Sequence, residues 1–136
     1  MTDGGNAAVV RSVFEAADRG DKQGLFRLLK PGVEWQLVGL MPDRPSFYRG
    51  REEVWAYARS LAEEIQDLRP ELTEVVEVGE QVVARVSLRG RSRVSGDDVA
   101  LDFSMLVRVA DGRIARADDY EDHEEALTDA ELRRDG

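Results

Sequence analysis

Residues 99–120, VALDFSMLVRVADGRIARADDY, decide the fold, because two strand patterns flank a tight-turn signal in this stretch. The segment Val99–Val109 alternates a fully apolar side with a more polar side, and Arg113–Tyr120 also has the composition of a strand. Between them, Asp111-Gly112 is a strong signal for a tight turn that joins two antiparallel strands. The stretch therefore predicts a β-hairpin in the C-terminal part of the chain.

Two more strands are predicted upstream of this hairpin. Leu72–Val78 and Gln81–Arg89 alternate or are rich in β-branched residues, and Gly79-Glu80 lies between them as a turn. A second turn signal, Ser95-Gly96-Asp97, separates them from the hairpin. Four consecutive strands with short connections predict an antiparallel sheet.

Arg51–Asp67 gives the strongest helical pattern in the chain. Glu52 and Glu53 suit the positive N-terminal end of a helix, and Pro70 is expected to close it. The apolar residues that recur with the 3.6-residue period are Val54, Trp55, Ala58, Leu61, Ala62 and Ile65.

The remaining segments complete the order of elements. Gly20 is expected to stop a first helix, and Asp21 to cap the helix that follows. The predicted elements are a helix over Asn6–Arg19, a short helix from Asp21 to Leu29, a strand over Val33–Val38, an apolar loop over Gly39–Gly50 and a last helix over His123–Arg134. This order predicts one α+β domain over residues 1–136, with helices on one face of a sheet.

The two sides of Val99–Val109 lead to a prediction about assembly. Helices can cover only one side of the sheet. If the fully apolar side of this strand lies away from them, it is too apolar to face water. A homodimer through the sheet is then the expected remedy.

Charge and composition exclude several classes of partner. The chain has 136 residues and a formal net charge of −9, so it repels phosphate backbones and anionic lipids. Neither nucleic acid nor a membrane is an expected partner. The absence of cysteine excludes disulfide and thiolate chemistry. No signal peptide or membrane-spanning run is visible, so we expect a cytoplasmic protein.

Four phrases at the joints between elements resemble the nuclear transport factor 2-like superfamily and its SnoaL-like branch. They are FEAADRGD over Phe14–Asp21, LKPGVEW over Leu29–Trp35, YRGREEV over Tyr48–Val54 and DGRIARADDY over Asp111–Tyr120. The resemblance implies a cone: a curved, mostly antiparallel sheet wrapped around N-terminal helices, with an apolar cavity open at one end. It also implies a homodimer, as in many members.

The superfamily includes steroid isomerases, polyketide cyclases, epoxide hydrolases and proteins that only bind, so the fold alone does not fix the function. Steroid isomerases use a carboxylate base, a tyrosine and a protonated carboxylic acid. Similarity places Trp35, Val13 and Ser104 at or near these positions. None of the three can perform the required role, and the isomerase mechanism is not expected.

Epoxide hydrolases of this fold use two carboxylates that flank an arginine. By similarity, Asp122 falls on one carboxylate and Arg85 on the arginine, but Ser87 stands at the second carboxylate. Asp102 on the neighbouring predicted strand is a candidate replacement. A structural ion pair between Asp102 and Arg85 is the competing interpretation.

SnoaL-type cyclases are thought to use one aspartate near the last strands as an acid/base. This chain has Asp118, Asp119 and Asp122 in that region, and its only histidine, His123, lies beyond the strand. The same acidic run can equally be a solvated strand end followed by a helix start.

We therefore predict a mainly apolar pocket that binds a small hydrophobic molecule, with cyclase, isomerase or hydrolase chemistry as the leading hypothesis. The candidate catalytic residues are Asp122 or Asp102 as acid/base and Arg85 as the orienting group. The predicted wall comprises Phe14, Trp35, Trp55, Ser87, Ser104 and Tyr120. No cofactor and no metal are predicted, because no phosphate loop or paired Cys/His motif is present.

The alternative is a non-catalytic binding or interaction domain of the same fold. A catalytic site needs at least one carboxylate inside the cavity with a hydrogen-bonding neighbour. If Asp102 and Asp122 both point to solvent, the binding hypothesis is favoured.

Overall fold

The computed structural model describes residues 5–37 and 45–134 of the chain. The elements are α1 (Gly5–Asp18), α2 (Lys22–Arg27), β1 (Leu29–Gln36), β2 (Phe47–Arg49), α3 (Arg51–Glu64), β3 (Ile65–Val78), β4 (Gln81–Ser92), β5 (Asp98–Ala110), β6 (Arg113–Tyr120) and α4 (His123–Arg134). Among the described helices, none is long and apolar enough to cross a membrane.

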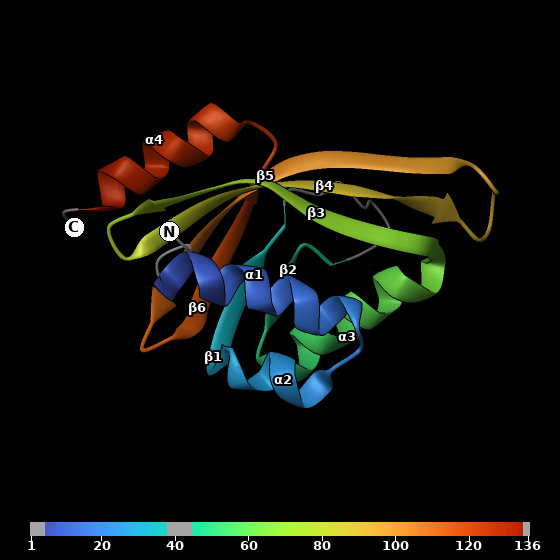
Figure 1. Ribbon diagram of the computed structural model, residues 1–136, viewed down its shortest axis with the longest axis horizontal. Helices are drawn as coiled ribbons and strands as arrows, with labels where there is room; N and C mark the ends of the chain where they lie inside the picture. The colour runs from blue at the N-terminus through green and yellow to red at the C-terminus, as the bar shows by residue number, and fades with distance from the viewer. Residues whose placement is uncertain (1–4, 38–44, 135–136) are drawn as a thin grey trace.

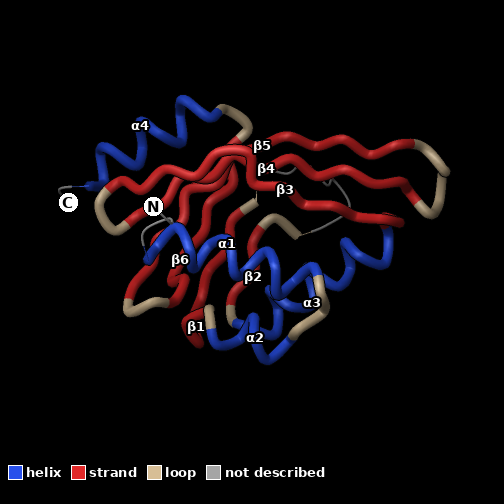
Figure 2. Tube along the Cα trace, in the orientation of Figure 1, coloured by secondary structure: helices blue, strands red, loops and turns tan. Residues whose placement is uncertain are grey.

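Six strands form one sheet in the order β2-β1-β6-β5-β4-β3. The β1–β6 pair is parallel, and the other neighbouring strands are antiparallel. The sheet bends over α1, α2 and α3, whereas α4 lies on its opposite side (Figures 1 and 2). The predicted α+β class, with a mostly antiparallel sheet and N-terminal helices on one face, is confirmed. The expectation that helices cover only one side of the sheet is wrong, because α4 packs on the other side.

The main core lies between the sheet and α1. On the inner face of the sheet, Val86 of β4 and Val107 of β5 are buried against Val10 and Val13 of α1. A fully buried valine or leucine contributes roughly 1.5–3 kcal/mol, whereas an exposed ion pair contributes about 0–1 kcal/mol. Stability therefore comes mainly from this core and not from the many surface charges.

The apolar side of β5 faces the helices, so the condition attached to the dimer prediction is not met. Met105 and Val107 belong to the main core, on the side that α1 covers. On the outer face, Ala126 and Ala130 of α4 pack over a second, smaller apolar cluster that includes Leu106. The homodimer stays a prediction.

The two N-terminal helices form as their residues predict. The buried residues of α1 follow the helical period, and Gly20 ends the segment with a φ of 71°. Asp21 caps α2, because its side chain accepts a hydrogen bond of 2.9 Å from the backbone N–H of Gly24. The helix ends at Arg27, and Leu29, predicted as helical, begins β1 instead.

The predicted end of the long helix is wrong. Helix α3 stops at Glu64, and Ile65 is extended with φ −116° and ψ 112°, although it fits the helical period. Pro70 does not close the helix but lies within β3, opposite Leu88. Proline is tolerated there because β3 is an edge strand, whose outer side needs no N–H donor.

The predicted apolar loop over 39–50 contains a short strand. Strand β2 pairs antiparallel with β1, and Tyr48 lies opposite Trp35. Residues 38–44, which include the predicted end of the strand at Val38, lie outside the described residues.

Candidate functional site

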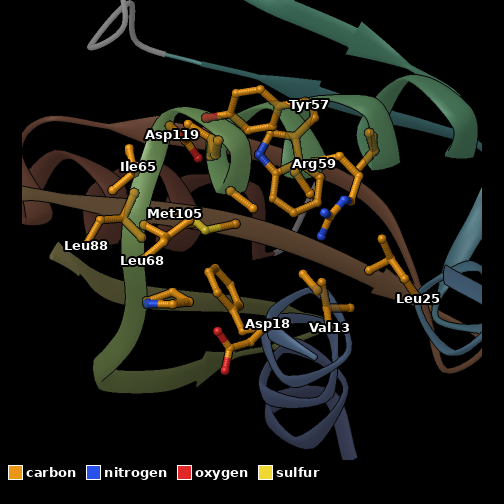
Figure 3. Close-up of a pocket in the computed structure, with 18 of the residues that line it drawn as sticks. Val13, Asp18, Leu25, Tyr57, Arg59, Ile65, Leu68, Leu88, Met105 and Asp119 are labelled. Atoms are coloured by element: carbon orange, nitrogen blue, oxygen red, sulfur yellow. The ribbon is translucent and has the colours of Figure 1, made fainter. Parts of the chain in front are cut away.

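A cavity of about 230 Å³ lies between α1, α3 and the inner face of the sheet. Figure 3 shows the side chains around it, with Met105 and Leu88 from the sheet, Val13 from α1 and Tyr57 from α3. Most of the wall is apolar: Val13, Phe14, Ala17, Leu25, Trp35, Val54, Leu61, Ile65, Leu68, Leu88, Phe103 and Met105. Such a wall excludes water and favours an apolar ligand.

Asp119 of β6 is the buried carboxylate of this cavity. Its residue is 9% exposed, and Oδ1 has no hydrogen-bond partner. Burial raises the pKa of Asp119 to about 8; a hydrogen bond from Trp35 opposes this rise, and the nearby charge of Asp118 adds to it. The group can therefore hold or release a proton near neutral pH.

The pairing of β1 with β6 places Trp35 beside Asp119. Trp35 lies opposite Ala117 in this parallel pair, and Asp119 is two residues further along β6 on the same face. The indole is 8% exposed, and Ala117 is fully buried. Two residues of the cavity wall that are 84 positions apart in sequence thus lie side by side on neighbouring strands.

Polar groups also mark other parts of the cavity wall. Tyr57 brings a hydroxyl group, and in Figure 3 its hydroxyl end points toward Asp119. The charged residues among those lining the cavity, besides Asp119, are the exposed Asp18, Arg59, Asp67 and Arg93. Asp67 has a φ of 55° at an irregularity in the β3–β4 register, a place where a bulge can redirect a side chain.

The structure places Arg85 and Asp102 on the outer face of the sheet, away from the cavity. Both are exposed, and neither lines it. Asp102 is opposite Ser87, while its side chain pairs with Arg89 at 3.1 Å, not with Arg85. Hydrogen bonds from Arg89 and then Ser87 lower the pKa of Asp102. The sequence predicts the alternation along β4 and β5 correctly, but the polar side of these strands faces outward and not into the cavity.

Asp122 does not line the cavity either. It is exposed just before α4, and its Oδ1 accepts a hydrogen bond of 2.9 Å from the backbone N–H of Glu124. This contact satisfies one free N–H group of the first helical turn. The geometry gives Asp122 a helix-capping role.

Two of the six predicted wall residues, Phe14 and Trp35, line the cavity. Trp55 lies outside it, beneath the guanidinium of Arg59 at 5.8 Å. Tyr120 points to the outer face and donates a 2.6 Å hydrogen bond to Asp129 of α4.

Ser87 and Ser104 share the outer face with Arg85 and Asp102, because these residues pair directly across β4 and β5. Each inner neighbour along the two strands is apolar, as the alternation requires. The assignment of both serines to the cavity wall is therefore not supported.

On the outer face, Ser104, His123 and Glu74 form a hydrogen-bonded chain. Ser104 Oγ is 2.7 Å from His123 Nδ1, and His123 Nε2 is 2.7 Å from Glu74 Oε2. The residue types match a nucleophile, a base and an orienting acid. However, Ser104 is only 1% exposed, so no substrate atom reaches its hydroxyl. These hydrogen bonds instead hold the start of α4 against β3 and β5.

Within the described residues, no group of three or more acidic or histidine side chains is arranged to hold a metal ion. His123 is occupied by Ser104 and Glu74.

Asp119 belongs to the acidic run at the end of β6, but it is not among the predicted catalytic residues. The signal that would have found it is the alternation in β6, which puts Ala117 and Asp119 on one face and Asp118 and Tyr120 on the other. A carboxylate that shares the buried face of a strand needs a partner or a raised pKa.

Comparison with known proteins agrees with this architecture. An NTF2-like protein of unknown function from Burkholderia pseudomallei is 29% identical, with a TM-score of 0.75 over 93% of this chain and 97% of that chain. An NTF2-like protein from Burkholderia xenovorans is 26% identical, with a TM-score of 0.74 over 96% of this chain and 98% of that chain.

A candidate polyketide cyclase from Sinorhizobium meliloti shares the fold at 19% identity, with a TM-score of 0.66 over 82% of this chain and 93% of that chain. No curated protein matches the sequence significantly. The family model of the SnoaL-like domain matches residues 10–117, which is most of the chain. The chain therefore belongs to the SnoaL-like domain family.

Proposed function

We propose that this protein is an acid/base catalyst that acts on a small, mainly apolar carbonyl compound, with Asp119 as the proton-transferring group. One observation carries the proposal: Asp119, a buried carboxyl group, lines an apolar cavity. Burial there raises its pKa to about 8. An acid/base catalyst works best when its pKa lies close to the working pH.

The size of the cavity limits the ligand. Pockets that bind drug-sized ligands measure roughly 300–1,000 Å³, and this cavity of about 230 Å³ is smaller. It suits a molecule of one or two rings better than one of four. The apolar wall favours a neutral body, so the polar group of the ligand belongs near Asp119 and Tyr57.

The chemistry follows from these groups. Ionised Asp119 removes a proton from the carbon next to the carbonyl, which leaves an enolate. Protonated Asp119 then returns the proton to a carbon or to the oxygen. A hydroxyl such as that of Tyr57 can donate a hydrogen bond to the enolate oxygen, and such donors stabilise the charge that develops there.

The alternative function, a domain that only binds, is supported by the exposure of Asp102 and Asp122. A catalytic site, however, needs only one carboxylate inside the cavity with a hydrogen-bonding neighbour. Asp119 is a carboxylate inside the cavity, with Trp35 beside it on the neighbouring strand. We therefore favour catalysis, with Asp119 as the acid/base in place of Asp102 or Asp122.

The test uses hydrogen–deuterium exchange at the carbon next to the carbonyl of 2-tetralone, a bicyclic ketone, followed by NMR in heavy water. We expect exchange above the buffer rate, rising with pH up to about 8, since the base must be ionised. Asp119→Asn should reduce it at least about 100-fold, whereas Asp102→Asn should leave it unchanged.

Binding of small ketones without catalysed exchange, detected by a change in Trp35 fluorescence in a Trp55→Phe background, would favour the binding alternative. Exchange that survives in Asp119→Asn would remove Asp119 from the mechanism.

A further inference from the structure

The cavity has a buried polar end and an exposed charged end. Asp119 is only 9% exposed, whereas the other charged residues of the wall lie in contact with water: Asp18, Arg59, Asp67 and Arg93. A ligand that fills the cavity therefore has one end beside a buried carboxyl group and the other end among exposed charges. A charged group on the ligand belongs at the exposed end, because a charge costs least where it keeps contact with water and a partner.

Helix α3 contributes a polar group to each end. Tyr57 and Arg59 both line the cavity, and they are two residues apart on this helix. Since an α-helix turns by about 100° per residue, the two side chains leave it in directions about 160° apart. In Figure 3, the hydroxyl end of Tyr57 points toward Asp119, whereas the guanidinium of Arg59 lies on the side of Leu25. The hydroxyl group and the cation thus flank the apolar stripe of the helix.

The fold holds the guanidinium of Arg59 at the wall. It lies over the ring of Trp55, one turn earlier on α3, at 5.8 Å from the ring centre, and Trp55 packs against the main core. Within residues 5–37 and 45–134, no carboxylate forms an ion pair with Arg59. Attraction to an aromatic ring leaves the N–H groups of a guanidinium available as hydrogen-bond donors. Arg59 is therefore a held cation with donors to offer a ligand.

The other exposed charges of the wall lack such a support. Arg93 lies in the connection after β4, where its backbone N–H donates a hydrogen bond of 3.0 Å to the carbonyl of Glu64. Asp18 ends α1, and Asp67 lies at the irregularity in β3. The planar fork of a guanidinium matches the two oxygens of a carboxylate, so the held cation favours an anionic group of that shape.

We propose that the cavity takes a small carboxylic acid with an apolar body, whose carboxylate is bound by Arg59. Its carbonyl group lies at the opposite end, beside Asp119, and this orientation rests on the proposed function. Arg59 determines the class of ligand and takes no part in proton transfer.

The test compares the binding of 2-tetralone-6-carboxylic acid and of its methyl ester by isothermal titration calorimetry, at about pH 7 and about 150 mM sodium chloride. The ketone and the carboxyl group are at opposite ends of this bicyclic compound, and the ester has nearly the same shape without the charge. We expect the acid to bind about 10-fold more tightly than the ester, because it gains charged hydrogen bonds. Arg59→Gln should bring the ratio of the two dissociation constants to about one.

Arg69→Gln is the matched control. It removes the same charge from an exposed arginine of β3 that does not line the cavity, so the preference for the acid should remain. Equal binding of acid and ester, no measurable binding of the acid, or a preference that survives Arg59→Gln overturns the proposal. Tighter binding of the 6-aminomethyl analogue than of the acid also overturns it, since Asp18 and Asp67 would then determine the preference.

This proposal and the proposed function fail separately. If the acid is preferred through Arg59 but no ketone exchanges, the carboxylate site stands and the catalytic function falls. If exchange depends on Asp119 but acid and ester bind equally, the function stands and the carboxylate site falls.

Discussion

The carboxylates on the two faces of the sheet differ in whether they are paired with a cation. On the outer face, Asp102 is paired with Arg89, and Asp118 contacts Arg116 at 3.0 Å and Arg133 at 3.7 Å. On the inner face, Asp119 is buried with one carboxyl oxygen unpaired.

The consequence is visible in the direction of the pKa shifts. Arg89 lowers the pKa of Asp102, whereas burial raises that of Asp119 to about 8. Abundance of acidic residues is therefore a poor guide to reactivity in this protein. A buried carboxylate without a cationic partner is a better candidate for acid/base catalysis than a carboxylate in an ion pair.

The largest expected effect on stability comes from Asp119→Asn. The folded pKa of about 8 lies above the ordinary value of 3.8. Between these values the folded protein retains a proton that the unfolded chain releases. The free energy of unfolding therefore loses a contribution as pH rises through this window.

Asparagine is neutral at every pH, so the free energy of unfolding of Asp119→Asn does not lose this contribution as pH rises. We expect the stability of Asp119→Asn relative to the unmodified protein to increase by about 4 kcal/mol from pH 5 to pH 8. Urea unfolding at both pH values measures it. A difference that is the same at both values would mean that Asp119 is ionised throughout.

A smaller effect is expected for the outer-face chain of Ser104, His123 and Glu74. His123→Ala leaves the hydroxyl of Ser104 buried without its partner, and should cost about 1–3 kcal/mol in the free energy of unfolding. Ser104→Ala combined with it should cost less than the sum of the single changes.

The same variant tests whether the outer face of the sheet influences the cavity on the inner face. If the outer chain only fastens α4, His123→Ala should leave the titration of Asp119 and the ketone exchange unchanged. A loss of exchange in a folded His123→Ala protein would show that the outer face takes part in the chemistry.

The smallest effect is expected for Asp102→Asn. The Asp102 side chain is 68% exposed and its ion pair with Arg89 is screened by water. We expect no change in the urea midpoint beyond experimental error at neutral pH. A clear loss of stability or of exchange would mean that this pair is buried by something that covers the outer face.

Local pattern predicts much of this fold, because strands and helices bury residues with different periods. The hairpin around Asp111-Gly112 and the first helix, which ends just before Gly20, follow from such patterns. Ile65 shows the limit: it fits the helical period of α3 but belongs to β3. Pairing with β4, a contact with distant residues, decides its conformation.

The site was harder to predict than the fold for a related reason. The alternation in β6 identifies which residues share a face with Asp119, but it does not say which face is inside. That depends on α1 and α3 covering one side of the sheet and α4 only part of the other (Figure 1). The contact with Trp35 needs the parallel β1–β6 pair, which no local pattern indicates.

The most direct test of a buried acid/base in the cavity is the titration midpoint of the Asp119 carboxyl carbon. Carbon-13 NMR measures it, with Asp119→Asn as the blank. We predict a midpoint of about 8, because the group is buried in an apolar wall and incompletely hydrogen-bonded. A midpoint near 3.8, the ordinary aspartate value, would show a solvated carboxylate. In that case, the cavity would hold no acid/base poised near neutrality.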